Sequence, residues 1–202
     1  MKNKLNRERT LCFSPQLAKQ SLRLAMRTRY RIVETEKIYS ITTTIVEWLP
    51  VFTRKPYFEV LIDSFNYSRT NKGLKIYAYV IMDNHFHLIC QGDDLGKIIK
   101  EIKSHTVREI IKLAEKNNKT WLLNQLSFYK LKHKVDSMHQ VWQEGNQPKQ
   151  ISSGEMLRQK TEYLHHNPVR AGLADKPEDW PYSSARNWAG LPGTLEIDLL
   201  EI

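Results

Sequence analysis

Apolar and polar residues follow patterns that predict an ordered body beginning near residue 36. Residues 38–46 are rich in β-branched and aromatic side chains, which favours a first strand. An amphipathic helix is predicted next, because four apolar residues recur at the spacing of one helix face: Phe58, Leu61, Ile62 and Phe65. Pro56 near its start and Gly73 after its end are typical helix boundaries.

A β-hairpin is predicted between residues 74 and 90. Small or apolar residues occupy alternate positions and are expected to share one face of its first strand: Leu74, Ile76, Ala78, Val80 and Met82. Asp83 and Asn84 favour a turn, and residues 85–90 then form the return strand. Both strands are therefore expected to lie in one antiparallel sheet.

A second long helix is predicted from Leu95, where the helical spacing of apolar residues returns. Asp93 or Asp94 is available to cap its first turn. Residues 118–150 are basic and polar with a weak pattern, and we expect only a short strand there, ending at Val141-Trp142.

A last helix is predicted over about residues 153–166. Ser152 and Glu155 have the spacing of a capping box, and Pro168 limits how far the helix continues. The order strand, helix, strand, strand, helix, then a short strand and a helix is typical of an α+β domain, with helices covering an antiparallel sheet.

The positive charge is concentrated at the beginning of the chain. The chain has 202 residues and a net charge of +9. Residues 1–31 hold nine basic side chains against Glu8, which leaves +1 for the other 171 residues. A basic arm indicates a polyanionic partner, with nucleic acid first, although a solvated terminal segment or anionic lipid would also account for the charge. We divide the chain into an arm (1–35), a body (36–190) and a terminal tail (191–202).

Other classes of protein are disfavoured by composition. The apolar runs are shorter than the roughly 20 residues that cross a bilayer, and the N-terminus has no apolar signal core. Cys12 and Cys90 are too few for a disulfide framework or a cysteine metal site. We therefore expect a cytoplasmic protein without a membrane partner.

Four side chains on two predicted elements suggest a reaction centre. Alternation along a strand points His85 and His87 to the same face, which makes half of a metal site that needs a third donor. Tyr163 and Asn167 lie four residues apart, about 40° around a helix, and so project from one side. A metal that polarises a phosphoryl oxygen would assist attack by a tyrosine hydroxyl, whereas a packed aromatic is the simpler interpretation of Tyr163.

The chain resembles the REP-associated tyrosine transposases, which have an IS200-like transposase domain and belong to the His-hydrophobic-His single-strand DNA transposases and nucleases. The resemblance covers roughly residues 36–190 and rests on four segments: YVIMDNHFHL (79–88), VWQEG (141–145), YLHHNPVRAGL (163–173) and KPEDWPYSS (176–184). Two departures are the presence of Asp83, where many relatives have proline, and an unusually polar segment at residues 146–150.

The resemblance implies a ferredoxin-like sheet, with the histidines on a central strand and Tyr163 on a C-terminal helix. It implies that His85, His87 and Asn167 bind Mg²⁺ or Mn²⁺, and that Tyr163 is the nucleophile that forms a 5′-phosphotyrosine link and frees a 3′-hydroxyl. The expected substrate is single-stranded or hairpin DNA, and the expected location is the bacterial nucleoid. A monomer and a homodimer both remain open.

Basic residues outside the reaction centre are candidates for DNA binding: Lys2, Lys4, Arg7, Arg9, Arg23, Arg27, Arg29, Arg31 and Arg170. We expect Trp180 and Trp188 to hold the C-terminal part of the chain against the body, with base stacking as the alternative. We expect His165 and His166 to be structural or exposed. Two other functions stay open at this stage. One is a DNA-binding protein that keeps the scaffold without cutting, and the other is a metal hydrolase in which water attacks.

Overall fold

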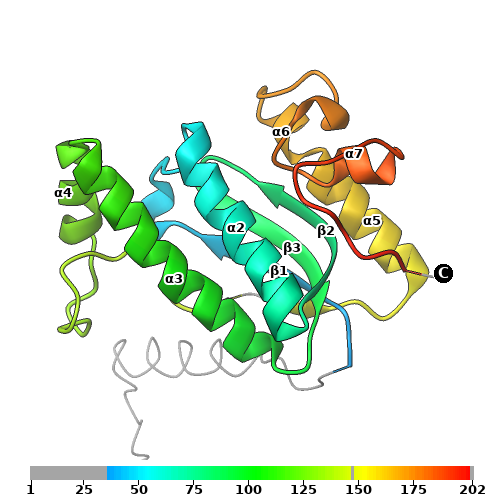
Figure 1. Cartoon of the computed structure of the whole chain (residues 1–202), viewed down its shortest axis with the longest axis horizontal. Helices are drawn as coiled ribbons and strands as arrows, with labels where there is room; N and C mark the ends of the chain where they lie inside the picture. Colours follow the sequence, from blue (N-terminus) through cyan, green and yellow to red (C-terminus); the bar gives the residue numbers. More distant parts are fainter. Residues whose placement is uncertain (1–35, 147, 201–202) are drawn as a thin grey trace, which may run out of the picture. The chain divides into compact units, whose positions relative to one another are not determined.

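A four-stranded antiparallel sheet organises the body in a computed structural model that describes residues 36–146 and 148–200. The strands are β1 (Tyr39–Thr44), β2 (Lys75–Ile81), β3 (His85–Gln91) and β4 (Lys149–Gln150), arranged in the order β2-β3-β1-β4. Two long helices, α2 (Lys55–Lys72) and α3 (Leu95–Lys116), lie side by side across one face (Figure 1). This β-α-β-β-α-β arrangement confirms the predicted ferredoxin-like α+β fold.

The ends of both long helices follow the sequence signals. Pro56 lies in the first turn of α2, and Gly73 ends the helix in the left-handed conformation, with φ of 66°, which glycine adopts without steric cost. The side chain of Asp94 accepts a hydrogen bond from the backbone N–H of Lys97, so Asp94 rather than Asp93 caps α3. The main apolar core lies between these helices and the sheet.

The hairpin forms as predicted, but its first strand does not present one face throughout. The register between β2 and β3 shifts between Ile76 and Ala78, which marks a β-bulge. Ile76 therefore packs in the core under α2 and α3, whereas Ala78 and Val80 pack in a second apolar cluster on the other face. The alternating pattern failed here because the bulge inserts one residue and reverses every later side chain.

The weakly patterned segment contains a helix that the sequence did not predict, α4 (Thr120–Phe128). The expected strand ending at Val141-Trp142 is reduced to one isolated bridge between Trp142 and Ile45, next to the short 3₁₀ helix η1 (Val46–Trp48). The fourth strand, β4, lies further along and pairs with β1 for only two residues.

The helix that carries Tyr163 is α5 (Gly154–His165), followed by the short helix α6 (Asn167–Arg170). Ser153, and not Ser152, is its cap: the Ser153 hydroxyl accepts a hydrogen bond from the backbone N–H of Met156 at 3.1 Å. The predicted capping box was therefore one residue out of register. Leu157 and Leu164 of α5 pack in the second apolar cluster, on the sheet face opposite α2 and α3.

The C-terminal segment runs along β2 and closes the sheet edge. It includes η2 (Pro177–Asp179) and α7 (Ala185–Trp188). The indole N–H of Trp180 donates to the carbonyl of Ile81, and that of Trp188 donates to the carbonyl of Tyr77. Both tryptophans therefore hold this C-terminal segment against β2, as expected.

The predicted arm, residues 1–35, lies outside the described residues. The chain divides into two units, residues 1–31 and 32–202, and every element described above belongs to the second. Among the described residues, no helix combines the length and the apolar character needed to cross a membrane.

Candidate active site

Strand β3 presents two imidazoles on the face that α5 covers in part. The ring centroids of His85 and His87 lie 4.8 Å apart, with the planes at 86°. Phe86, between them in sequence, is fully buried in the core on the opposite face. The predicted His-hydrophobic-His alternation is thus present in the structure.

Each imidazole is held through its Nδ1 atom. The Nδ1 atom of His87 lies 2.8 Å from the hydroxyl of Thr42 on the neighbouring strand β1. The Nδ1 atom of His85 lies 2.6 Å from the side-chain oxygen of Asn84, whose amide N–H in turn donates to the carbonyl of Trp48. These contacts leave each Nε2 atom available to a ligand and fix the orientation of both rings.

Burial keeps both imidazoles neutral. Desolvation lowers the pKa of His85, and the charge of Asp83 opposes part of that shift. The pKa of His87 is lowered to about 3, chiefly by desolvation and further by the charges of His85, Arg170 and Lys160. A neutral imidazole is the form that binds a metal ion, so the pair is suited to ligation at neutral pH.

A hollow of about 210 Å³ brings His87 and Tyr163 together. It is lined by residues from β1, β3, β4 and α5: Ser40, Thr42, His87, Lys149, Lys160, Tyr163 and Leu164. The side chain of Tyr163 is 58% exposed, so this residue is not the packed aromatic that the simpler interpretation required. Its phenol is accessible to a substrate in the hollow.

Arg170 connects Tyr163 to Asn167. Its Nη2 atom donates to the backbone carbonyl of Tyr163 at 2.6 Å and to the side-chain oxygen of Asn167 at 3.1 Å. The guanidinium carbon lies 4.3 Å from the centroid of the Tyr163 ring. Apart from that contact with Arg170, the side chain of Asn167 bonds within the described residues to the carbonyl of Leu164 and to neither histidine. The guanidinium of Arg170 therefore contacts both Tyr163, at the end of α5, and Asn167, at the start of α6.

The donor set fits a divalent cation with mixed ligands. Residues 36–146 and 148–200 contain no group of three His, Cys, Asp or Glu side chains that would hold a metal. A cation here would use the free Nε2 atoms of His85 and His87 and would need oxygen donors besides them. The side-chain oxygen of Asn167 retains a second lone pair beyond its bond to Arg170 and is the sequence-predicted donor of this kind.

Sequence reasoning missed two lysines of the hollow, Lys149 and Lys160. Lys160 lies one helical turn before Tyr163, so the i, i+3 spacing on α5 was a usable signal. Lys149 had no such signal, because its position depends on the pairing of β4 with β1. Of the polar segment, this pairing places Lys149 and Gln150 at the edge of the sheet. The hairpin turn that contains Asp83 is closed by a hydrogen bond from the backbone N–H of Met82 to the carbonyl of His85 at 2.8 Å.

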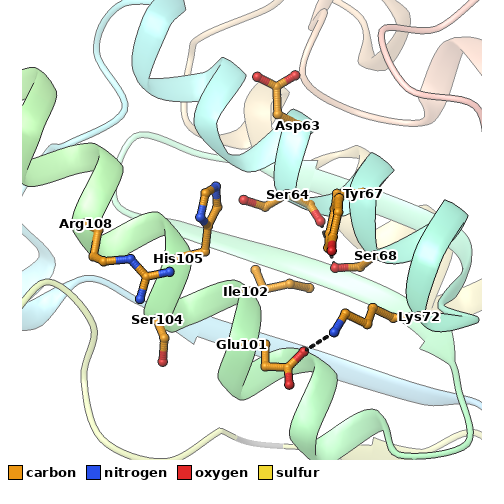
Figure 2. Close-up of a pocket in the computed structure, with 10 residues that line it drawn as sticks. All are labelled: Asp63, Ser64, Tyr67, Ser68, Lys72, Glu101, Ile102, Ser104, His105 and Arg108. Atoms are coloured by element: carbon orange, nitrogen blue, oxygen red, sulfur yellow. Dashed lines mark hydrogen bonds and ion pairs between the residues drawn. The ribbon is translucent and has the colours of Figure 1, made fainter.

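A larger cavity, of about 660 Å³, lies between α2 and α3. Figure 2 shows Lys72 and Glu101 joined by an ion pair at its edge, with His105 and Arg108 further along α3. Neither His85, His87 nor Tyr163 lines it, so we place the candidate chemistry in the smaller hollow. The eight candidate DNA-binding residues of the arm lie outside the described residues.

Comparison with known proteins points to one family. The family model described as "Transposase IS200 like" matches residues 33–153. A structure titled "Structure of the REP associates tyrosine transposase bound to a REP hairpin" is similar with a TM-score of 0.58 at 19% identity, over 87% of this chain and 94% of that chain. A weaker likeness, with a TM-score of 0.42 at 15% identity over 69% of this chain and 96% of that one, joins it to a Deinococcus radiodurans R1 protein described provisionally as a transposase. No curated protein matches this chain.

Proposed function

Since the chain belongs to the IS200-like transposase family, we propose that it nicks and rejoins single-stranded or hairpin DNA through a covalent 5′-phosphotyrosine intermediate on Tyr163. The observation that carries this proposal is the shared hollow of His87 and Tyr163. A phenol from a helix and an imidazole from a central strand face one space, which is the arrangement that tyrosine attack on a bound phosphate requires.

In this proposal Tyr163 supplies the attacking oxygen. A bond forms between its Oη atom and the phosphorus, the bond from phosphorus to the DNA 3′-oxygen breaks, and the strand end is released as a 3′-hydroxyl. The phenol proton is lost and the departing oxygen gains one. Rejoining runs the same displacement backwards with a 3′-hydroxyl as nucleophile, so the phosphodiester energy is kept in the enzyme-DNA bond.

His85, His87 and Asn167 would hold Mg²⁺ or Mn²⁺, in keeping with their donor atoms. A bound divalent cation would polarise the phosphoryl oxygen and neutralise charge that develops during the displacement. Thr42 and Asn84 contact the Nδ1 atoms of the two imidazoles, which leaves each Nε2 atom for the cation. Of these three ligands only His87 lines the hollow itself.

Three cationic side chains are assigned to the phosphate backbone. Lys149 from β4 and Lys160 from α5 both line the hollow, so a phosphate entering it would lie near two cations. Arg170 lies over the ring of Tyr163 and places a fixed positive charge beside the nucleophile. These residues would position the scissile phosphate and reduce its negative charge as the phenol approaches.

The kind of DNA proposed as substrate is supported by the family and by the positive charge of the arm. The structurally similar transposase was solved bound to a REP hairpin, and we propose a hairpin-bearing single strand as the substrate here. The nine basic residues of the arm would supply a sequence-independent attraction for such DNA. A soluble, nucleoid-associated protein is consistent with this role.

A denaturing gel separates this proposal from its two rivals. A hairpin-bearing single strand labelled at its 3′ end is incubated with the protein and Mg²⁺ or Mn²⁺. We expect a slowly migrating protein-DNA band, which a protein that only binds DNA would not form. A hydrolase that uses water would cut the strand without forming the band.

The metal requirement is tested in the same gel. His87→Ala should abolish cutting and leave hairpin binding largely intact, because the imidazole is proposed to hold the cation and not the DNA. Full cutting activity in excess chelator would contradict the proposed metal requirement.

A further inference from the structure

A second surface, away from the hollow, has the composition of a nucleic-acid contact. Trp121 and Phe128 lie seven residues apart on α4, which places them on one side of the helix, about 10 Å apart along its axis. Their side chains are 60% and 78% exposed, and Tyr129 follows with its ring in edge contact with Phe128. Exposed aromatic side chains so close together are unusual on a protein that has buried its core elsewhere.

The same segment is strongly basic. Residues 116–135 contain five lysines and no acidic residue, whereas the whole of residues 32–202 carries a net charge of only +1. Two of the five lysines are engaged within the protein: Lys130 donates to the carbonyl of Lys134, and Lys134 pairs with Glu144 at 3.8 Å. Within the part of the chain that the structure describes, Lys116, Lys119 and Lys132 have no ion pair. The excess charge of this segment is therefore available to a polyanion.

The helix that carries these aromatic side chains is anchored on the core. Leu122 and Leu126 are buried and anchor α4 against the core next to α3. After the helix, the backbone N–H of Gln140 donates to the carbonyl of Leu126, and the side chain of Gln140 accepts from the N–H of Leu131. The exposed rings thus project from an anchored element, so binding them would cost little ordering of the backbone.

We propose that Trp121, Phe128 and Tyr129, together with Lys116, Lys119 and Lys132, form a binding surface for single-stranded DNA, here named the α4 surface. Aromatic rings stack on unpaired bases, and the lysines neutralise the adjoining phosphates. Duplex DNA fits less well, because its bases are already stacked on one another. A protein partner would explain the rings but not the uncompensated charge.

The α4 surface rests on the proposed DNA substrate but not on the chemistry of Tyr163. Figure 1 shows α4 packed on α3, whereas α5, which carries Tyr163, lies against β2 on the other side of the sheet. A strand held on α4 is therefore not the strand segment in the hollow. It is a single-stranded flank that would anchor the substrate while the hollow acts on the scissile phosphate.

The test measures equilibrium binding without cleavage. Full-length protein carrying Tyr163→Phe is titrated against a labelled oligothymidylate, which forms no hairpin, and against a blunt-ended hairpin without single-stranded flanks. Adding Trp121→Ala with Phe128→Ala should weaken binding of oligothymidylate by at least about tenfold and change hairpin binding much less. Adding Lys119→Gln with Lys132→Gln should lower the slope of log affinity against log salt by about 1.4, at roughly 0.7 per phosphate contact.

Tyr67→Ala is the matched control, because Tyr67 is 58% exposed on α2 and outside the α4 surface. All substituted side chains are exposed or half-buried, so the thermal unfolding midpoints should agree, which shows that the variants fold. Unchanged oligothymidylate affinity in the aromatic variant, or an equal loss in the Tyr67 control, overturns the proposal. So does a change of oligomeric state with unchanged DNA affinity, which would make the surface a protein contact. Covalent attachment to hairpin DNA by the wild-type protein is scored separately, so failure here is distinct from failure of the nicking activity.

Discussion

Thr42 determines which nitrogen of His87 faces the hollow. Its hydroxyl lies 2.8 Å from Nδ1, and the two residues are direct partners across the β1-β3 ladder. Thr42 lines the hollow and belongs to neither apolar cluster. Its effect is on the ring orientation and hence on any ligand that binds Nε2.

Replacing Thr42 by valine keeps the shape of the side chain and removes the hydroxyl. We expect the affinity for Mn²⁺ to fall by about 10- to 100-fold, as is typical when the partner of a ligating imidazole is lost. Isothermal titration calorimetry of the full-length proteins measures this Mn²⁺ affinity. Thr44→Val makes the same chemical change on the same face of β1 and should have a much smaller effect. Equal Mn²⁺ affinity in the wild-type and Thr42→Val proteins would contradict the assigned orientation.

His165 provides a pH test that is separate from the chemistry. Its Nε2 atom bonds to the hydroxyl of Ser184, and its pKa is lowered to about 4, first by burial and then by the charge of His166. Between pH 6.5 and 4 the unfolded chain binds a proton on this ring that the folded protein does not. The free energy of unfolding must therefore fall as the pH falls through this range.

The variant His165→Gln should show a shallower loss of stability with acid. One imidazole contributes at most about 1.4 kcal/mol per pH unit to the slope, and the other buried histidines contribute to both proteins alike. Urea unfolding of the metal-free proteins at several pH values from 6.5 to 4.5 gives the two slopes. Parallel slopes would show that His165 is not buried in its neutral form.

Spacing along the sequence was enough to identify the candidate reactive side chains, but not the other residues that line the hollow. His85, His87 and Tyr163 stand out because alternation and helical periodicity put them on defined faces. The position of Lys149 could not be predicted, because a two-residue strand at a sheet edge has no periodicity of its own. Its place in the hollow depends on the pairing of β4 with β1, which is a long-range contact.

Among the secondary-structure elements, the sequence did not predict the bulge in β2 or the helix α4. The bulge in β2 moved Ala78 and Val80 to the face opposite Ile76, although all three are buried. Both faces of β2 are covered, so its apolar side chains do not indicate which of them face α2 and α3 and which face α5. Helix α4 was missed because it buries only Leu122 and Leu126, too few residues to establish a period.

The start of α5 gives a matched test of the revised helix boundary. Ser153→Ala should lower the free energy of unfolding by about 1 kcal/mol, because the backbone N–H of Met156 loses its acceptor. Ser152→Ala changes the neighbouring residue and should have little effect. Urea unfolding of both variants checks the difference. The opposite ranking would restore the capping box that the sequence first indicated.

At the scale of the molecule, the charge of the arm is tested by removing it. Deleting residues 1–31 removes a net charge of +8 out of +9. If about half of the nine basic residues contact phosphates, the slope of log affinity against log salt should fall by roughly 3 on single strands. Binding of hairpin-bearing DNA is measured over a range of salt concentrations. An unchanged slope would mean that the body, including the α4 surface, supplies the electrostatic attraction.

Tyr163 is proposed to become covalently linked to DNA, and mapping the linked peptide shows whether it does. The adduct is digested with protease and nuclease, and the modified peptide is sequenced by mass spectrometry. We predict a nucleotide joined through its 5′-phosphate to the peptide that contains Tyr163, and no adduct with Tyr163→Phe, which keeps the ring but lacks the oxygen. Tyr129→Phe and Tyr182→Phe should still form it. Linkage to another side chain, or cleavage by Tyr163→Phe at the normal rate, would show that Tyr163 is not the nucleophile.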